Sequence, residues 1–109
     1  MKIKKFLLIL ILSFLLNSQT SFADEAKMTK GLEIFNETAG CAACHVLKAA
    51  GSEGNIGPNL DTVEGLNYNS VMDIVTHGLG VMPAFGEDEI LTKEEIDIVS
   101  FYVANSVSK

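Results

Sequence analysis

Apolar residues recur at intervals of three and four along most of this chain, the spacing that places side chains on one face of an α-helix. The first such stretch runs from Glu25 to Glu37, with Met28, Leu32 and Phe35 on one face and Ile34 beside it. Runs that alternate between apolar and polar positions, as a half-buried strand does, are nearly absent. The pattern therefore predicts an all-α protein.

Further helices are expected downstream of the first. A short one spans residues 41–46, another spans residues 69–77 and stops at "HGLG", and the last continues to about Ser106. The last helix has the clearest start, because Thr92 and Glu95 form a capping box. The segment between the second and third helices, "LKAAGSEGNIGPNLDTVEG", is rich in glycine and predicts a long loop. A loop of this length in a small domain needs something to wrap around.

The N-terminus has the pattern of a secretory signal peptide. Lysines precede the apolar run Phe6 to Leu16, and "SQTSFA" follows. We expect residues 1–23 to be cleaved between Ala23 and Asp24, which implies export to the periplasm. The alternative is a retained membrane anchor, but the apolar run is shorter than the roughly 20 residues that a spanning helix needs. Cleavage would leave residues 24–109 as a single domain with no membrane span.

The charge of the mature chain restricts its partners. It keeps five lysines against all 14 acidic residues, a formal net charge of −9. This charge argues against nucleic acid and anionic membranes, and it favours protein partners with a basic docking face. A domain this small is also marginally stable unless a disulfide, a metal or a cofactor adds to its core.

Both cysteines lie in "GCAACHVLK", with Cys41 and Cys44 three apart and His45 next. A thioredoxin-like redox pair needs a βαβ context that this chain lacks. A zinc site needs four ligands, and the only other histidine is His77. A structural disulfide is a further alternative. Covalent haem c fits best, because two cysteines on one helical turn reach one porphyrin edge and the following histidine projects toward the iron.

An iron-bound His45 needs an acceptor for its other ring nitrogen, because metal-bound histidines are generally oriented by such a bond. The stretch "GPNL" offers the backbone carbonyl of Pro58. Taken alone, this stretch would be an ordinary turn, and it becomes informative only because it follows the haem motif. We therefore expect Pro58 to belong to the cofactor site.

The opposite face of the iron needs a ligand or stays open. Met82 is the candidate, because it lies in "HGLGVMPAFG", where glycines allow close backbone approach and a proline stiffens the exit. His77 is the rival ligand. Met28 and Met72 lie in expected helices, and Met72 is assigned to packing.

The stretches "CAACH", "GPNL" and "GVMPAF", followed by a last helix beginning "LTKEEI", resemble the class I c-type cytochromes, in particular the small single-haem bacterial ones. The resemblance covers essentially the whole mature chain. It implies a cytochrome c fold, with three to four short helices wrapped around one covalently bound haem. It also implies that Gly31 and Phe35 in the first helix pack against Val99 and Tyr102 in the last.

An iron held by both His45 and Met82 has no open site for a substrate, which leaves one-electron transfer as the expected activity. The expected protein is thus a periplasmic electron carrier and not an enzyme, and we expect a monomer. A five-coordinate haem sensor or peroxidase is the alternative if Met82 does not bind the iron. A third possibility is the cytochrome subunit of a periplasmic dehydrogenase complex.

The chain departs from the family pattern in two informative places. Five residues, "NETAG", separate Phe35 from Cys41, so the first helix is expected to end early or to bulge. The chain also has no arginine to pair with the haem propionates, and buried carboxylates without donors are costly. Propionates that face water are one solution. The candidate side-chain partners are Tyr68, Asn67, Asn69 and Lys48, together with backbone N–H groups.

Overall fold

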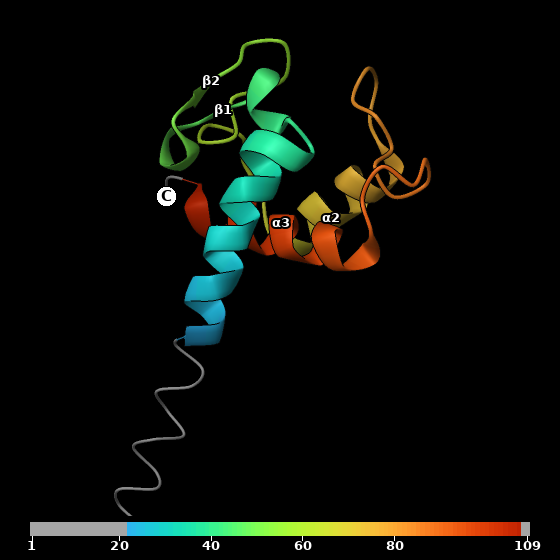
Figure 1. The fold of residues 1–109 in the computed structure, drawn as a ribbon. Helices are drawn as coiled ribbons and strands as arrows, with labels where there is room; N and C mark the ends of the chain where they lie inside the picture. The colour runs from blue at the N-terminus through green and yellow to red at the C-terminus, as the bar shows by residue number, and fades with distance from the viewer. Residues whose placement is uncertain (1–21, 108–109) are drawn as a thin grey trace, which may run out of the picture.

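The computed structural model describes residues 22–107, whose main elements are three helices. They are a first helix over residues 22–33, α2 (Tyr68–His77) and α3 (Lys93–Ser106), and in Figure 1 the first helix crosses α3. The predicted signal peptide lies outside the described residues apart from its last two. None of the helices within residues 22–107 has the length and apolar character needed to cross a bilayer.

Short elements connect the first helix to α2. In chain order they are the π-helical turn η1 (Ile34–Thr38), the 3₁₀ turn η2 (Cys41–Ala43), β1 (Val46–Leu47), the 3₁₀ turn η3 (Lys48–Ala50) and β2 (Ser52–Glu53). The strands β1 and β2 pair antiparallel, with Leu47 opposite Ser52. The helical class predicted from the pattern is correct, and within residues 22–107 the departures from it are this hairpin and an isolated antiparallel bridge between Leu79 and Met82.

The helix expected over residues 41–46 was wrong in its extent. Only Cys41–Ala43 form a helical turn, and Val46 already begins a strand. The reason lies in the next segment, which folds back onto the turn. The Gly57 N–H donates to the Cys44 carbonyl at 2.8 Å and takes the acceptor that a continuing helix would use.

The extra residues before the cysteines form a bulge, as expected. The Ala39 N–H donates to the Ile34 carbonyl at 2.9 Å, a bond that spans five residues and marks a π-helical turn. The Asn36 side chain donates to the Ala50 carbonyl at 3.3 Å. This turn accommodates the longer connection and ties the end of the first helix to η3.

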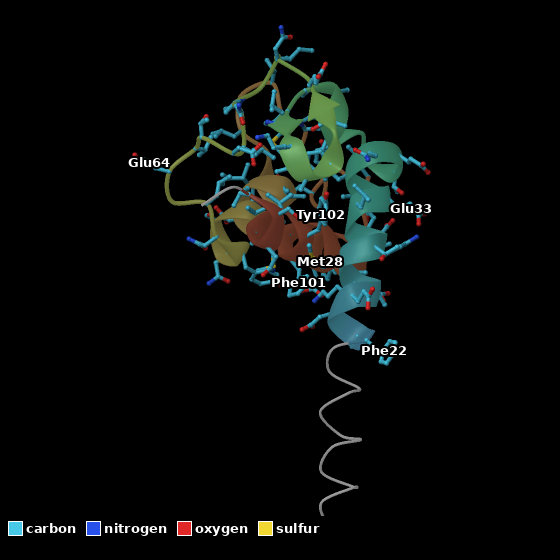
Figure 2. The ribbon with its side chains drawn as sticks, turned by 90° about the vertical axis from the view of Figure 1, so that its left-hand side faces the viewer. Phe22, Met28, Glu33, Glu64, Phe101 and Tyr102 are labelled. Atoms are coloured by element: carbon cyan, nitrogen blue, oxygen red, sulfur yellow. The ribbon has the colours of Figure 1, made fainter. Side chains whose placement is uncertain are left out.

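The first and last helices cross where the family resemblance predicted. A Cβ on Gly31 would lie 2.3 Å from the Tyr102 Cβ and 3.2 Å from the Ile98 carbonyl oxygen, so only glycine permits this approach. The rings of Phe35 and Tyr102 lie 6.0 Å apart at 56°, a tilted pair worth about 0.5–1.5 kcal/mol. Figure 2 shows Met28 and Tyr102 where the two helices meet, on the side of the first helix away from Glu33.

One residue of the first helix was assigned to the wrong face. Leu32 is exposed, whereas Ile34 is fully buried beside Phe35. The close crossing at Gly31 explains the difference, because it centres the buried face on Gly31 and turns Leu32 toward water.

The two later helices begin as their sequences indicate. Thr92 and Glu95 form the predicted capping box of α3, with bonds of 3.0 and 3.1 Å. Asn67 and Ser70 form a second capping box at α2, which starts one residue before the predicted range. The helices α2 and α3 pack against each other and contribute most of the core. The buried apolar residues are Ile34, Phe35, Leu47, Val71, Val75, Phe85, Leu91, Ile96, Val99, Tyr102 and Val103.

Candidate functional site

A mostly apolar cavity of about 590 Å³ opens between the cysteine turn, the loops on either side of α2, and α3. Its volume is in the range of cofactor sites. Cys41, Cys44 and His45 line it from the turn that follows η1, and Met82 lines it from the loop between α2 and α3. The apolar walls come mainly from Phe35, Leu60, Leu66, Val71, Ile74, Val75, Phe85, Val99 and Val103. The four residues with ligand chemistry therefore share one cavity.

His45 is held in a defined orientation on this cavity. Its Nδ1 lies 2.7 Å from the Pro58 carbonyl oxygen, the contact expected from "GPNL". Because a carbonyl oxygen only accepts, Nδ1 donates this bond, and in the neutral ring Nε2 has the lone pair that a metal would take. Gly57 lies against the ring, and a Cβ there would be 2.5 Å from Cε1. The imidazole is thus supported on one side by backbone alone.

The two thiols are not bonded to each other and are partly buried. Burial raises the pKa of the Cys41 thiol to about 11. A redox-active pair works through a thiolate of lowered pKa, and the surroundings of Cys41 do not provide one. Within residues 22–107 no group of three or more histidine, cysteine or acidic side chains is arranged to hold a metal ion. The two thiols keep the spacing of a haem c attachment motif, with His45 as the next residue.

Met82 lies on a small hairpin. The Met82 N–H donates to the Leu79 carbonyl at 3.0 Å, and the Leu79 N–H donates back at 3.3 Å. Gly80 in the turn has a φ of +59° and Gly78 before it has a φ of +74°, both in the region that favours glycine. A Cβ on Gly78 would also lie 2.7 Å from the Met82 carbonyl oxygen. The glycines flagged in the sequence therefore shape this loop.

The base of the methionine loop is closed by a backbone bond to α2 and by an ion pair of His77, whose side chains do not line the cavity. The Phe85 N–H donates to the Val75 carbonyl at 2.9 Å. His77 Nδ1 lies 2.5 Å from Glu87 Oε1, and His77 Nε2 lies 3.6 Å from Asp73. The hydrogen bond to Glu87 raises the pKa of His77. The rival ligand His77 therefore does not line the cavity.

The remaining methionines of the described chain also lie elsewhere. Met28 packs on the core from the first helix, and Met72 lines a separate groove beside α2. The acidic stretch from Glu87 to Glu89 is exposed. Met82 is thus the one methionine of residues 22–107 that lines the cavity together with His45.

Tyr68, which the sequence assigned to the cofactor, is not among the residues that line the cavity. Its hydroxyl donates to Asp97 Oδ1 at 2.5 Å, and Lys27 contacts Asp97 Oδ2 at 2.9 Å. The hydrogen bond from Tyr68 is the main cause that lowers the pKa of Asp97, and the contact with Lys27 lowers it further. The bond between Tyr68 and Asp97 also raises the pKa of Tyr68. The trio instead links the first helix, α2 and α3.

The other proposed propionate partners do not line the cavity either. Asn67 caps α2 by accepting from the Ser70 N–H, and Asn69 lines the groove beside α2. Lys48 is exposed, and its backbone N–H donates to Asp61 at 2.8 Å.

Sequence reasoning missed the apolar residues that line the cavity from loops. Ile56, Leu79 and Val81 all contact it, although they are 70%, 69% and 91% exposed. Large apolar side chains so exposed at the edge of an apolar cavity indicate a surface that is normally covered. The available signal was their position as isolated apolar residues in glycine-rich loops.

Comparison with known proteins agrees with this geometry. Residues 26–103 match the family described as cytochrome C oxidase, cbb3-type, subunit III. The chain belongs to this family and is a small c-type cytochrome.

Among solved structures, the chain is similar to the c-type cytochrome SorU from Sinorhizobium meliloti, with 44% sequence identity and a TM-score of 0.69. The similarity covers 78% of this chain and 95% of that one. No curated protein sequence gives a significant match.

A c-type cytochrome carries haem through thioether bonds, and the described residues fit this group. The cysteine pair has the required spacing, His45 presents a free Nε2, and the walls are apolar. Gly57 leaves room at the ring where any side chain would collide.

Proposed function

We propose that this protein carries one electron at a time on a single haem c, attached through Cys41 and Cys44 and ligated by His45 and Met82. The observation that carries the proposal is the grouping of these four residues on one apolar cavity. When bound, haem supplies a one-electron Fe(III)/Fe(II) couple. The protein is accordingly an electron carrier and not an enzyme.

The protein residues supply the conditions for this exchange. The cysteines fix the position of the group, and the Pro58 carbonyl orients His45 and makes it a better donor. The Met82 thioether favours the reduced state, and apolar walls from Phe35 and Val99 do so as well by excluding water. With both axial positions filled, no site is left for a substrate.

Substitution of Met82 tests the assignment of the second ligand. The purified wild-type protein should show the weak ferric absorption band of an iron–sulfur bond. Met82→Leu should abolish the band and lower the reduction potential, because a leucine provides no thioether. Met72→Leu is the matched control, since Met72 is also half-buried but lines the groove beside α2, and it should retain the band.

The outcome of the same experiment separates the two haem functions. A wild-type protein that lacks the band and readily binds carbon monoxide when reduced would contradict the proposal. That result would favour a five-coordinate sensor or peroxidase.

We further propose that the protein works as a monomer in the periplasm and docks on redox partners through a basic face of the partner. The support is the signal-peptide pattern and the net charge of −9 that remains after cleavage, from 14 acidic residues and five lysines. Electron exchange with a basic redox protein should therefore slow steeply as ionic strength rises. A rate that does not depend on salt, or that rises with it, would contradict this docking mode.

We propose that the haem propionates face water, because the chain has no arginine to pair with them. No lysine within residues 22–107 lines the cavity, and Tyr68, Asn67 and Asn69 do not line it either. In a structure of the haem-bound protein, the propionate oxygens should contact solvent or backbone N–H groups. A propionate shielded from water and bound to Lys48 or Tyr68 would contradict this arrangement.

A further inference from the structure

Ser52 is one of two buried polar residues in the described chain, with 7% of its surface exposed. It begins β2 opposite Leu47, and its Oγ accepts from the Leu47 N–H at 2.9 Å. The same hydroxyl donates to the His45 carbonyl at 2.8 Å. A longer approach of 3.3 Å to the Leu47 carbonyl competes for the single proton, so the bond to His45 is the main one.

These bonds complete the support of His45. Its N–H donates to the Cys41 carbonyl at 3.0 Å, and its carbonyl accepts from Ser52 at 2.8 Å. Its ring is held by Pro58 and rests against Gly57. The peptide groups on both sides of the His45 Cα are therefore fixed, which sets the direction in which the side chain leaves the backbone.

The hairpin that carries Ser52 is short. Each strand is two residues long, and a hairpin of this size is not stable by itself. Without the Ser52 hydroxyl, the Leu47 N–H would be buried with no acceptor, because Leu47 is fully buried. An unpaired buried donor is costly, so the hairpin would shift or open and the His45 carbonyl would move with it.

We propose that Ser52 is a positioning residue that holds the backbone of His45 and thereby fixes the orientation of the axial imidazole. This inference rests on the proposed role of His45 as an iron ligand. Residues that orient a metal ligand without touching the metal commonly alter its properties when they are replaced. Ser52 extends this support from the ring of His45 to its backbone.

The test uses the haem-loaded protein and three variants. Ser52→Ala removes the hydroxyl, and Ser52→Thr retains it. Ser100→Ala is the matched control, because Ser100 is fully buried and its hydroxyl has no hydrogen-bond partner within residues 22–107. The measurements are the haem-methyl proton resonances of the ferric protein, the reduction potential, and hydrogen exchange at the Leu47 amide.

In Ser52→Ala, exchange at the Leu47 amide should rise about tenfold, the size expected for one lost buried bond. The haem-methyl resonances and the potential should shift as well, because they depend on the orientation of the axial imidazole. Ser52→Thr should restore wild-type values, and Ser100→Ala should leave them unchanged. Faster exchange in Ser52→Ala with unchanged resonances and potential would overturn the proposal and leave Ser52 a purely structural role.

The remaining outcomes are also decisive. If Ser52→Ala does not take up haem, Ser52→Thr decides: wild-type resonances support the proposal, and failure to load or shifted resonances contradict it. Equal shifts in Ser100→Ala would also overturn it. A wrong proposed function would appear differently, because the wild-type protein itself would then carry no haem or show no histidine ligation.

Discussion

The cavity is bounded by two ligand-bearing segments that are built in different ways. On the histidine side, Pro58 contacts the ring of His45, and Ser52 contacts its backbone. On the methionine side, Met82 lies on a small hairpin with two backbone hydrogen bonds, and the flanking Leu79 is largely exposed. The base of that loop is closed by the Phe85–Val75 backbone bond and by the exposed pair of His77 and Glu87.

The difference indicates which ligand is held more firmly. Local opening is easiest where few buried contacts and many solvent-exposed backbone bonds are present. The histidine segment is folded back on the cysteine turn, where Gly54 and Gly57 allow direct backbone contact. In the methionine loop, Leu79 and Val81 on either side of Gly80 are largely exposed. We therefore expect loss of Met82 ligation to precede loss of His45 ligation under mild perturbation.

The largest effect is expected from Gly57→Ala. The added Cβ would lie 2.5 Å from His45 Cε1, and this overlap forces the imidazole away from its position at a cost of about 1–3 kcal/mol. Haem loading and the free energy of unfolding should both fall. Chemical denaturation and the haem content of the purified protein measure these effects.

Pro58→Ala is the control for Gly57→Ala, because it keeps the carbonyl that accepts from His45. It should retain most of the haem loading. Equal losses in both variants would show that the loop as a whole matters and that the contact between Gly57 and the ring does not.

Gly78→Ala should weaken the methionine side selectively. The residue has a φ of +74°, and its Cβ would lie 2.7 Å from the Met82 carbonyl oxygen. With its ψ of 171°, this conformation is adopted essentially by glycine alone, and it costs another residue about 1–3 kcal/mol before any overlap is added. The iron–sulfur absorption band should weaken while the haem stays attached.

Gly80→Ala separates strain from overlap on the same loop. Its φ is +59°, but no atom lies within 4 Å of the added Cβ. It should show the conformational cost alone, and therefore a smaller loss of the band. A stronger effect at Gly80 than at Gly78 would contradict this description of the loop.

The smallest effect concerns pH and the ion pair of His77 with Glu87. The pair raises the pKa of His77 above its ordinary value of 6.5. Its stabilising contribution is therefore fully present below pH 6.5 and is lost as the pH rises through the higher pKa of the folded state. Both side chains are more than half exposed, so the effect on the methionine loop is modest.

Glu87→Gln tests this pair directly. An NMR titration of His77 should give a lower pKa in this variant than in the wild type. Asp73→Asn is the comparison, because Asp73 lies 3.6 Å away and should change the pKa less. An unchanged His77 titration in Glu87→Gln would show that the pair contributes nothing in solution.

Local signals in the sequence were sufficient for much of the fold. The capping box of Thr92 and Glu95 depends only on residues three apart in the sequence. The glycine at position 31 depends on one close contact, with Tyr102. The bulge before Cys41 also followed from counting residues between two fixed positions. In each case the residue type allows few alternatives.

Less could be predicted where a distant partner decides the outcome. Tyr68 pairs with Asp97, which lies 29 residues away along the chain, so its own neighbours could not predict the bond. Ser52 is buried because a two-residue hairpin brings it to His45, and such a short strand has no periodicity to detect. Haem binding by Cys41, Cys44, His45 and Met82 stays a prediction until it is measured.

The most direct test of this account is the intact mass of the exported protein after denaturation. The account predicts a polypeptide that begins at Asp24 and retains the mass of one haem, with neither Cys41 nor Cys44 available to a thiol reagent. A denatured chain without the added mass, and with both thiols reactive, would contradict it.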